Sequence, residues 1–212
     1  MKNYSPILFE AYDKFMLSLG GKKIPTPYRI NIPYQSDRKK YGKSDPDTLT
    51  TDTRRLVVER NFDLNKATEQ EIRSFMEKNM LGIDCSGFVY HLLDYLLRHT
   101  NKGGMENIGF PPAQRTNVWL LTSKEFTIPV DDLTHALAGD LIKLNSGQDL
   151  LHCLIVLDHQ NSMITYTHSS RFNKPSGIQI GKITEGKFPD DLQVFSYNPN
   201  KGDGIRRLKM LK

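Results

Sequence analysis

The 212-residue chain contains only two cysteines, Cys85 and Cys153, and a single tryptophan. Two cysteines do not make a disulfide framework, and without histidine ligands they cannot form a thiolate zinc site. The sequence has neither a CxxC nor an HExxH pattern, and "GDGIRR" lacks the third glycine of a dinucleotide fingerprint. These absences favour a protein that needs no metal and no organic cofactor.

Long apolar runs are also missing: none approaches the roughly eighteen residues that a membrane-spanning helix needs. Residues 1–21 do not resemble a signal peptide, because Glu10, Asp13 and Lys14 interrupt their apolar positions. We therefore expect a cytoplasmic protein with no transmembrane segment. Export to the cell wall by a non-classical route is the alternative.

The charge balance is mildly basic, with a net charge of +5 from 29 Lys and Arg against 24 Asp and Glu. Part of this charge lies in the C-terminal segment "KGDGIRRLKMLK". A basic tail can bind anionic partners, but this one lacks the aromatic residues interleaved in a nucleic-acid surface. We expect a solvated terminal strand and no nucleic-acid partner. The oligomeric state stays open.

Helical patterns dominate the first half of the chain. Apolar residues recur from Ser5 through Leu19, which predicts a first helix that stops at two glycines. Residues 22–55 are rich in proline and charge, so we expect an extended segment that wraps the body or lines a cleft. Thr68 and Glu71 then form the capping box of another helix.

Strand patterns dominate the second half. The short β-rich segments are "DLIKL", "LHCLIVLD", "SMITYTHS", "GIQIGKI", "QVFSY" and "IRRLKML". Helices followed by strands predict an α+β fold, with a helix that begins at Cys85 packed on an antiparallel sheet. We assign residues 81–212 to this core and residues 1–80 to a helical and loop-rich N-terminal extension packed on it.

Cys85 stands in "GIDCSGFVY", at the beginning of the apolar-periodic helix. The positive end of a helix dipole stabilises a thiolate, and unpaired amides at a helix start can bind an oxyanion. The small residues Ser86 and Gly87 would let a substrate approach the sulfur. A free cysteine is also commonly a buried, inert hydrophobe, so this stretch alone leaves both interpretations open.

A cysteine nucleophile needs a base and a group that orients the base. Among six histidines, His152 begins one apolar strand and His168 ends the next. A three-residue loop at 159–161 would set His152 directly opposite His168 on one face. A two-residue loop would instead set His168 opposite Cys153 and separate the imidazoles. We expect Cys153 to point away from His152, as a small core hydrophobe.

In order along the chain, "DCSGFV", "AGDLIKL", "HCLIVLD" and "YTHSS" resemble the signature of the NlpC family of papain-like cysteine peptidases. The resemblance covers about residues 80 to 170. It implies a papain-like fold with Cys85 as nucleophile, His152 as general base and acid, and His168 as the group that orients His152. The remaining matched positions near the nucleophile, which we expect to shape the site, are Asp84, Ser86 and Gly87.

The resemblance further implies hydrolysis of a peptidoglycan stem peptide, often at a γ-D-glutamyl bond, so the expected partner is a peptide or muropeptide. The family's tyrosine element before the nucleophile is absent here; Tyr28 or Tyr34 could replace it as the second oxyanion donor. Two alternatives stay open. The same site could serve a deamidase, transamidase or acyltransferase with a non-wall substrate, or the chain could be a non-catalytic binding module on a papain-like scaffold.

Overall fold

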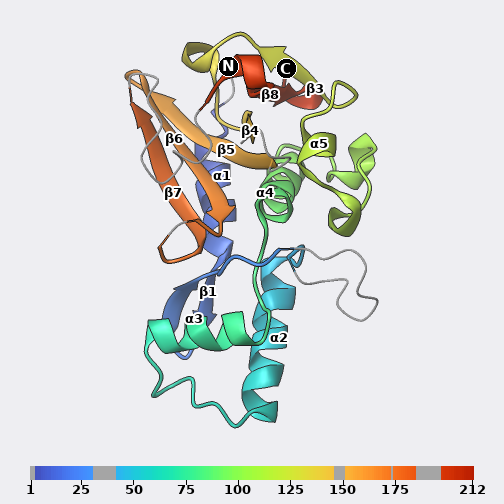
Figure 1. Cartoon of the computed structure of the whole chain (residues 1–212). Coiled ribbons are helices and arrows are strands. Elements are labelled where there is room, and N and C mark those ends of the chain that lie inside the picture. The colour runs from blue at the N-terminus through green and yellow to red at the C-terminus, as the bar shows by residue number, and fades with distance from the viewer. Residues whose placement is uncertain (1–2, 31–41, 146–150, 173, 185–196) are drawn as a thin grey trace.

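The computed structural model describes residues 3–30, 42–145, 151–172, 174–184 and 197–212 (Figure 1). In this part of the chain, five α-helices accompany an antiparallel sheet, which confirms the α+β prediction. The helices are α1 (Ser5–Lys14), α2 (Pro46–Glu59), α3 (Glu69–Lys78), α4 (Cys85–His99) and α5 (Val118–Leu121).

The main sheet has the strand order β3-β8-β4-β5-β6-β7, and all recorded pairings are antiparallel. A separate hairpin, β1 with β2, lies near the N-terminus. The strands are β1 (Met16–Leu19), β2 (Lys22–Pro25), β3 (Thr127–Val130), β4 (Leu141–Asn145), β5 (Leu151–Gln160), β6 (Met163–Ser170), β7 (Gly177–Thr184) and β8 (Gly204–Leu208).

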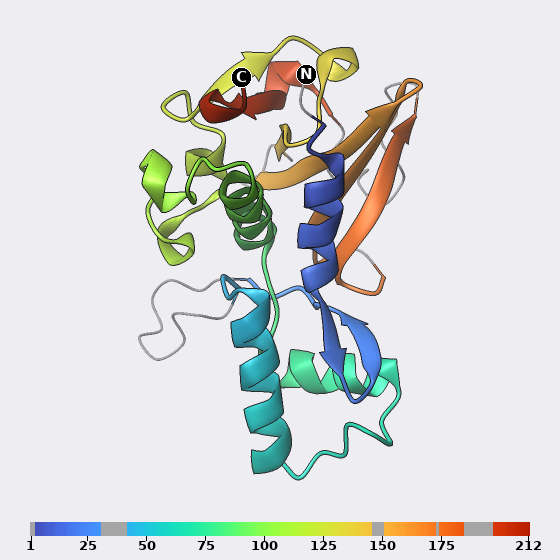
Figure 2. The same ribbon diagram turned by 180° about the vertical axis from the view of Figure 1, so that it is seen from behind.

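Helices α1 and α4 pack against each other and cover one face of the sheet at β5 (Figure 2). Strand β5 is buried on both faces, which explains its continuous apolar sequence. Cys153 and Ile155 join the apolar cluster under the two helices, whereas Leu154 and Val156 join a second cluster on the opposite face. Side-chain alternation along β5 therefore divides the core into two layers.

The first predicted helix is wrong in its second half. Helix α1 ends at Lys14, and the apolar residues that follow form β1. Gly20 and Gly21 adopt φ values of 55° and 74°, so they make a tight turn that pairs β1 with β2. Tertiary pairing thus overrides a local helical pattern.

The prediction of an extended segment at residues 22–55 is also wrong in part. Helix α2 begins at Pro46, where Asp45 caps it by accepting a hydrogen bond from the Thr48 amide at 2.8 Å. Proline is favoured at the first position of a helix because its missing N–H has no partner there. The capping box of Thr68 and Glu71 is confirmed at the start of α3.

The C-terminal basic segment is not a solvated edge. Strand β8 lies inside the sheet, between β3 and β4. Arg207 in β8 forms an ion pair with the buried Asp140 at 2.7 Å, so this part of the basic charge is structural. The predicted strand "QVFSY" lies mostly outside the described residues.

Helices α2 and α3 and the β1–β2 hairpin gather at one end of the molecule, and the main sheet lies toward the other (Figures 1 and 2). The segment from α3 to α4 runs between these two parts, so the first turn of α4 begins near their junction. Within the described ranges, no helix has the length and apolar character needed to cross a bilayer. The boundary between residues 80 and 81 stays a prediction.

Candidate active site

Asp84 defines the beginning of α4. Its backbone is extended, and its carboxylate accepts a hydrogen bond from the Gly87 amide at 2.7 Å, while its carbonyl accepts one from the Phe88 amide. The first amides of a helix have no intrahelical partner. The Asp84 side chain thus satisfies one of them, that of Gly87, while the bond from Phe88 is the first regular bond of the helix. Within the described ranges, no partner is recorded for the amides of Cys85 and Ser86.

Lys43 is buried directly beneath this helix start. Its ammonium lies 2.7 Å from Asp84 Oδ1 and also donates a hydrogen bond to Ser86 Oγ. The Lys43 carbonyl accepts a hydrogen bond from His91 Nε2 at 2.9 Å, which anchors the lysine to the middle of α4. One buried cation therefore holds the residues on both sides of Cys85. No pattern in the sequence indicated this role for Lys43.

Gly87 lets the chain around Gly42 and Lys43 approach the helix. A Cβ atom at Gly87 would lie 2.6 Å from the Gly42 carbonyl oxygen and 2.9 Å from Lys43 Cδ. Neither distance is tolerable without movement of Gly42 and Lys43. The glycine of "DCSG" is thus required by a close backbone approach that also delivers Lys43.

Cys85 is the first residue of α4, and its side chain is buried beside Cys153. The pKa of the Cys85 thiol is lowered well below its ordinary value. A hydrogen bond with Cys153 lowers this pKa most. The charge of His152, a hydrogen bond with His152 and the charge of Lys43 lower it further, whereas burial raises it. Burial and the neighbouring Cys85 raise the pKa of Cys153. Of the two thiols, Cys85 is therefore the one that loses its proton more readily.

Cys153 is buried on the α4 side of β5, and it is more than a core hydrophobe. It lies close enough to Cys85 to influence the ionisation of that thiol. The sequence did not indicate this contact, because it depends on how α4 crosses β5.

The β5–β6 hairpin has the turn that we expected to separate the two imidazoles. Gln160 pairs with Met163, so the loop has two residues, and the structure has the second of the two alternatives rather than a three-residue loop at 159–161. Both loop residues, Asn161 and Ser162, have positive φ, which suits a tight hairpin turn. With an unbroken ladder, this turn would place the imidazoles on opposite faces.

A β-bulge between Val156 and Asp158 adds one residue to β5 and so returns the two imidazoles to the same face. Beyond the bulge, Ile155 pairs with Thr167. Continued toward the beginning of β5, this register places His168 opposite Leu154. His168 is then a diagonal neighbour of His152 on the same face, rather than directly opposite it.

The two imidazoles are in contact. His152 Nε2 lies 2.7 Å from His168 Nδ1, and the rings meet edge to face with centroids 5.0 Å apart. Both side chains are buried, His168 completely. Burial, with His152 as a second contribution, lowers the pKa of His168 well below its ordinary value, so this imidazole is neutral. A neutral imidazole can orient His152 as a carboxylate or amide does elsewhere.

Tyr28 is placed beside the nucleophile, since its backbone forms a parallel bridge with Ile83. Its pKa is raised, first by burial and then by the charges of Cys85 and Asp84, so the hydroxyl stays protonated and can donate a hydrogen bond. The other tyrosine candidate, Tyr34, lies outside the described residues. On the opposite side, Ser169 Oγ in β6 donates to the Ile83 carbonyl at 2.7 Å and ties the entry to α4 onto the sheet.

Two comparisons with known proteins found no relative of this chain. Neither a scan against protein-family models nor a search of curated proteins finds a match to this chain. The NlpC resemblance therefore depends on the residues described above.

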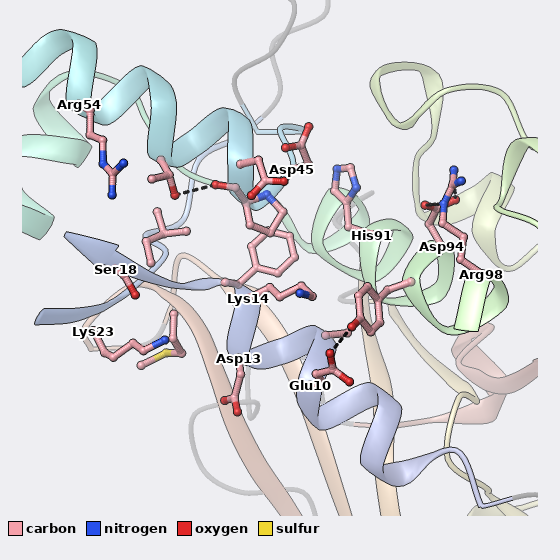
Figure 3. Close-up of a pocket in the computed structure, with 18 residues that line it drawn as sticks. Glu10, Asp13, Lys14, Ser18, Lys23, Asp45, Arg54, His91, Asp94 and Arg98 are labelled. Atoms are coloured by element: carbon pink, nitrogen blue, oxygen red, sulfur yellow. Dashed lines mark hydrogen bonds and ion pairs between the residues drawn. The ribbon is translucent and has the colours of Figure 1, made fainter. Parts of the chain in front are cut away.

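A separate cavity of about 680 Å³ lies between α1, α2, α4 and β1, and none of the three predicted catalytic residues lines it (Figure 3). His91 and Asp45 point toward one another on its wall, opposite Lys23 and Arg54. His91 is the connection between this cavity and the nucleophile, through its hydrogen bond to Lys43.

Chemical labelling can test the assignment of the thiolate. The rate of iodoacetamide labelling at Cys85 is expected to follow a titration well below the pKa of about 8.5 of a free thiol. Cys153, whose pKa is raised, should react far more slowly at every pH. Peptide mass spectrometry separates the two sites, and equally slow labelling of both thiols would contradict the assignment.

Proposed function

We propose that the protein is a cysteine peptidase or amidase that uses Cys85, His152 and His168, with a papain-like arrangement of α4 on the sheet. The observation that carries this proposal is the convergence of a thiol of lowered pKa, at a helix start, with a pair of hydrogen-bonded imidazoles. A scaffold that only binds a ligand has no need for this combination of groups.

The mechanism follows from the positions of the groups. His152 takes the proton of the Cys85 thiol, and the thiolate attacks the amide carbonyl carbon. Because Nε2 of His152 is engaged by His168, Nδ1 is the nitrogen that exchanges this proton. The C–N bond then breaks as His152 returns the proton to the departing amine, which leaves a thioester on Cys85. Water, deprotonated by His152, hydrolyses the thioester and regenerates the thiol.

The oxyanion formed in each half-reaction needs donors in place beforehand. The Cys85 amide, at the positive end of α4, supplies one, and the Tyr28 hydroxyl is our candidate for the second. The carboxylate of Asp84 would repel an oxyanion, but Lys43 neutralises it at 2.7 Å.

For the substrate we propose a peptidoglycan stem peptide cleaved at a γ-D-glutamyl bond, on the resemblance to the NlpC family. The test is digestion of purified muropeptides followed by mass spectrometry, with the Cys85→Ala protein as the control. New fragments that appear only with the unaltered protein, and that differ from the substrate by addition of water across one amide bond, would support the proposal. Intact muropeptides, together with deamidation or acyl transfer to another acceptor, would favour a different acyl-transfer reaction at the same site.

A further inference from the structure

The imidazole pair has a third member on the next strand. Gln179 in β7 pairs directly with His168 in β6, and its side-chain Nε2 lies 3.3 Å from His168 Nε2. His168 Nδ1, on the other side of the ring, lies 2.7 Å from His152 Nε2. Three side chains thus form one line of polar contacts, from β7 across β6 to the base beside Cys85.

The protons along this line are coupled, because each neutral imidazole has one donor and one acceptor nitrogen. To accept the thiol proton, His152 needs a lone pair on Nδ1 and therefore carries its hydrogen on Nε2. That hydrogen points at His168 Nδ1, which must then be an acceptor. The hydrogen of His168 is consequently on Nε2, and the group facing it must accept.

The amide of Gln179 can serve as that acceptor. A half-turn about its last side-chain bond exchanges nitrogen for oxygen, and the surrounding hydrogen-bond network decides between these two orientations. With the amide nitrogen toward His168, the chain of hydrogens reverses: His168 donates from Nδ1, and His152 must carry its hydrogen on Nδ1. In that arrangement His152 has no lone pair for the thiol proton. Only the oxygen-inward orientation supports general-base catalysis.

We propose that Gln179 is a positioning residue that selects the catalytic tautomer of both imidazoles by accepting the Nε2 hydrogen of His168. This inference rests on the proposed function of Cys85 and His152 and adds a residue that the triad does not contain. Gln179 acts through His168, the imidazole that its side chain contacts.

Two further observations support this role. Thr167 Oγ1 donates a hydrogen bond to the Gln179 carbonyl at 2.7 Å, which fixes the β7 backbone beside His168. Burial keeps His168 neutral, so the ring carries a single hydrogen, and its hydrogen-bond partners decide which nitrogen holds it. Other titratable or charged groups recorded near the imidazole pair or the neighbouring thiol include Cys85, Cys153, Lys43, Asp84, Tyr28 and Tyr166.

Two variants of nearly equal size separate acceptor function from simple packing. An ionised Glu in place of Gln179 can only accept a hydrogen bond, whereas Leu can neither accept nor donate one. We expect Gln179→Leu to lower kcat by roughly 10- to 100-fold with little change in KM, as is typical for loss of a group that orients a functional histidine. Gln179→Glu should retain much more activity. Its negative charge favours the imidazolium form of His152, so the alkaline limb of the pH–rate profile should move to higher pH.

The tautomers can be observed directly by ¹⁵N NMR of labelled histidine side chains. In the unaltered protein and in Gln179→Glu, both His152 and His168 should carry a hydrogen on Nε2, and Gln179→Leu should lose this preference at His168. A His168 hydrogen on Nδ1 in the unaltered protein would overturn the inference. So would equal loss of activity in both variants with no change in the pH limbs. If no amide is hydrolysed at all, the proposed function fails, yet the NMR result still decides the role of Gln179.

Discussion

Replacing Cys85 with alanine is expected to lower kcat/KM for amide hydrolysis by roughly four to six orders of magnitude, because it removes the nucleophile on which the whole catalytic unit depends. Cys153→Ala is the matched control. Both thiols are buried, they are neighbours, and the two substitutions delete the same atoms. Loss of activity in Cys85→Ala alone would therefore reflect chemistry and not packing.

The control has its own expected effect. The hydrogen bond with Cys153 makes the largest contribution to the lowered pKa of Cys85, so Cys153→Ala should raise that pKa. The acid limb of the pH–rate profile would then move to higher pH, since the thiolate forms only above the pKa. Steady-state rates measured against pH test both statements. Equal losses in the two variants would contradict the assignment of Cys85 as the nucleophile.

Replacing Lys43 with methionine is expected to produce the largest loss of stability, about 3–5 kcal/mol in the free energy of unfolding, because Asp84 would become an uncompensated buried charge. The ion pair is almost completely enclosed, with side-chain exposures of 3% for Lys43 and 8% for Asp84. Urea unfolding followed by circular dichroism measures the change.

The double variant Lys43→Met/Asp84→Asn is the decisive comparison. It removes both charges, and asparagine remains a good helix cap, so most of the lost stability should return. Single losses that simply add in the double variant would show that the two side chains are not coupled. In that case the anchoring role assigned to Lys43 would be wrong.

The sequence predicted the parts of the site that depend on local pattern. Cys85 at a helix start and two histidines at strand ends follow from helical and strand periodicity together with the motif order. The α+β class follows from the same patterns. These features need only neighbouring residues to be recognised.

The remaining parts depend on contacts that the sequence does not encode locally. Lys43 comes from a segment with no regular period, and only the close approach at Gly87 brings it beneath α4. Gln179 can be recognised as a neighbour of His168 only when the register between β6 and β7 is known. Residues 16–19 show the opposite case, since pairing with a neighbouring strand overrode the helical pattern that the sequence displays there.

The bulge in β5 gives the hairpin a property like a reading frame. The two-residue turn shifts the pairing by one, and the extra residue between Val156 and Asp158 shifts it back, as a compensating deletion restores a reading frame. A change of one residue in the length of this hairpin would therefore move one imidazole to the other face of the sheet. A single insertion or deletion on the His168 side would exchange an imidazole for the hydroxyl of a neighbouring Thr or Ser, whereas a compensating pair would preserve the site. Related chains that keep the two imidazoles should therefore vary in the length of this hairpin by paired steps.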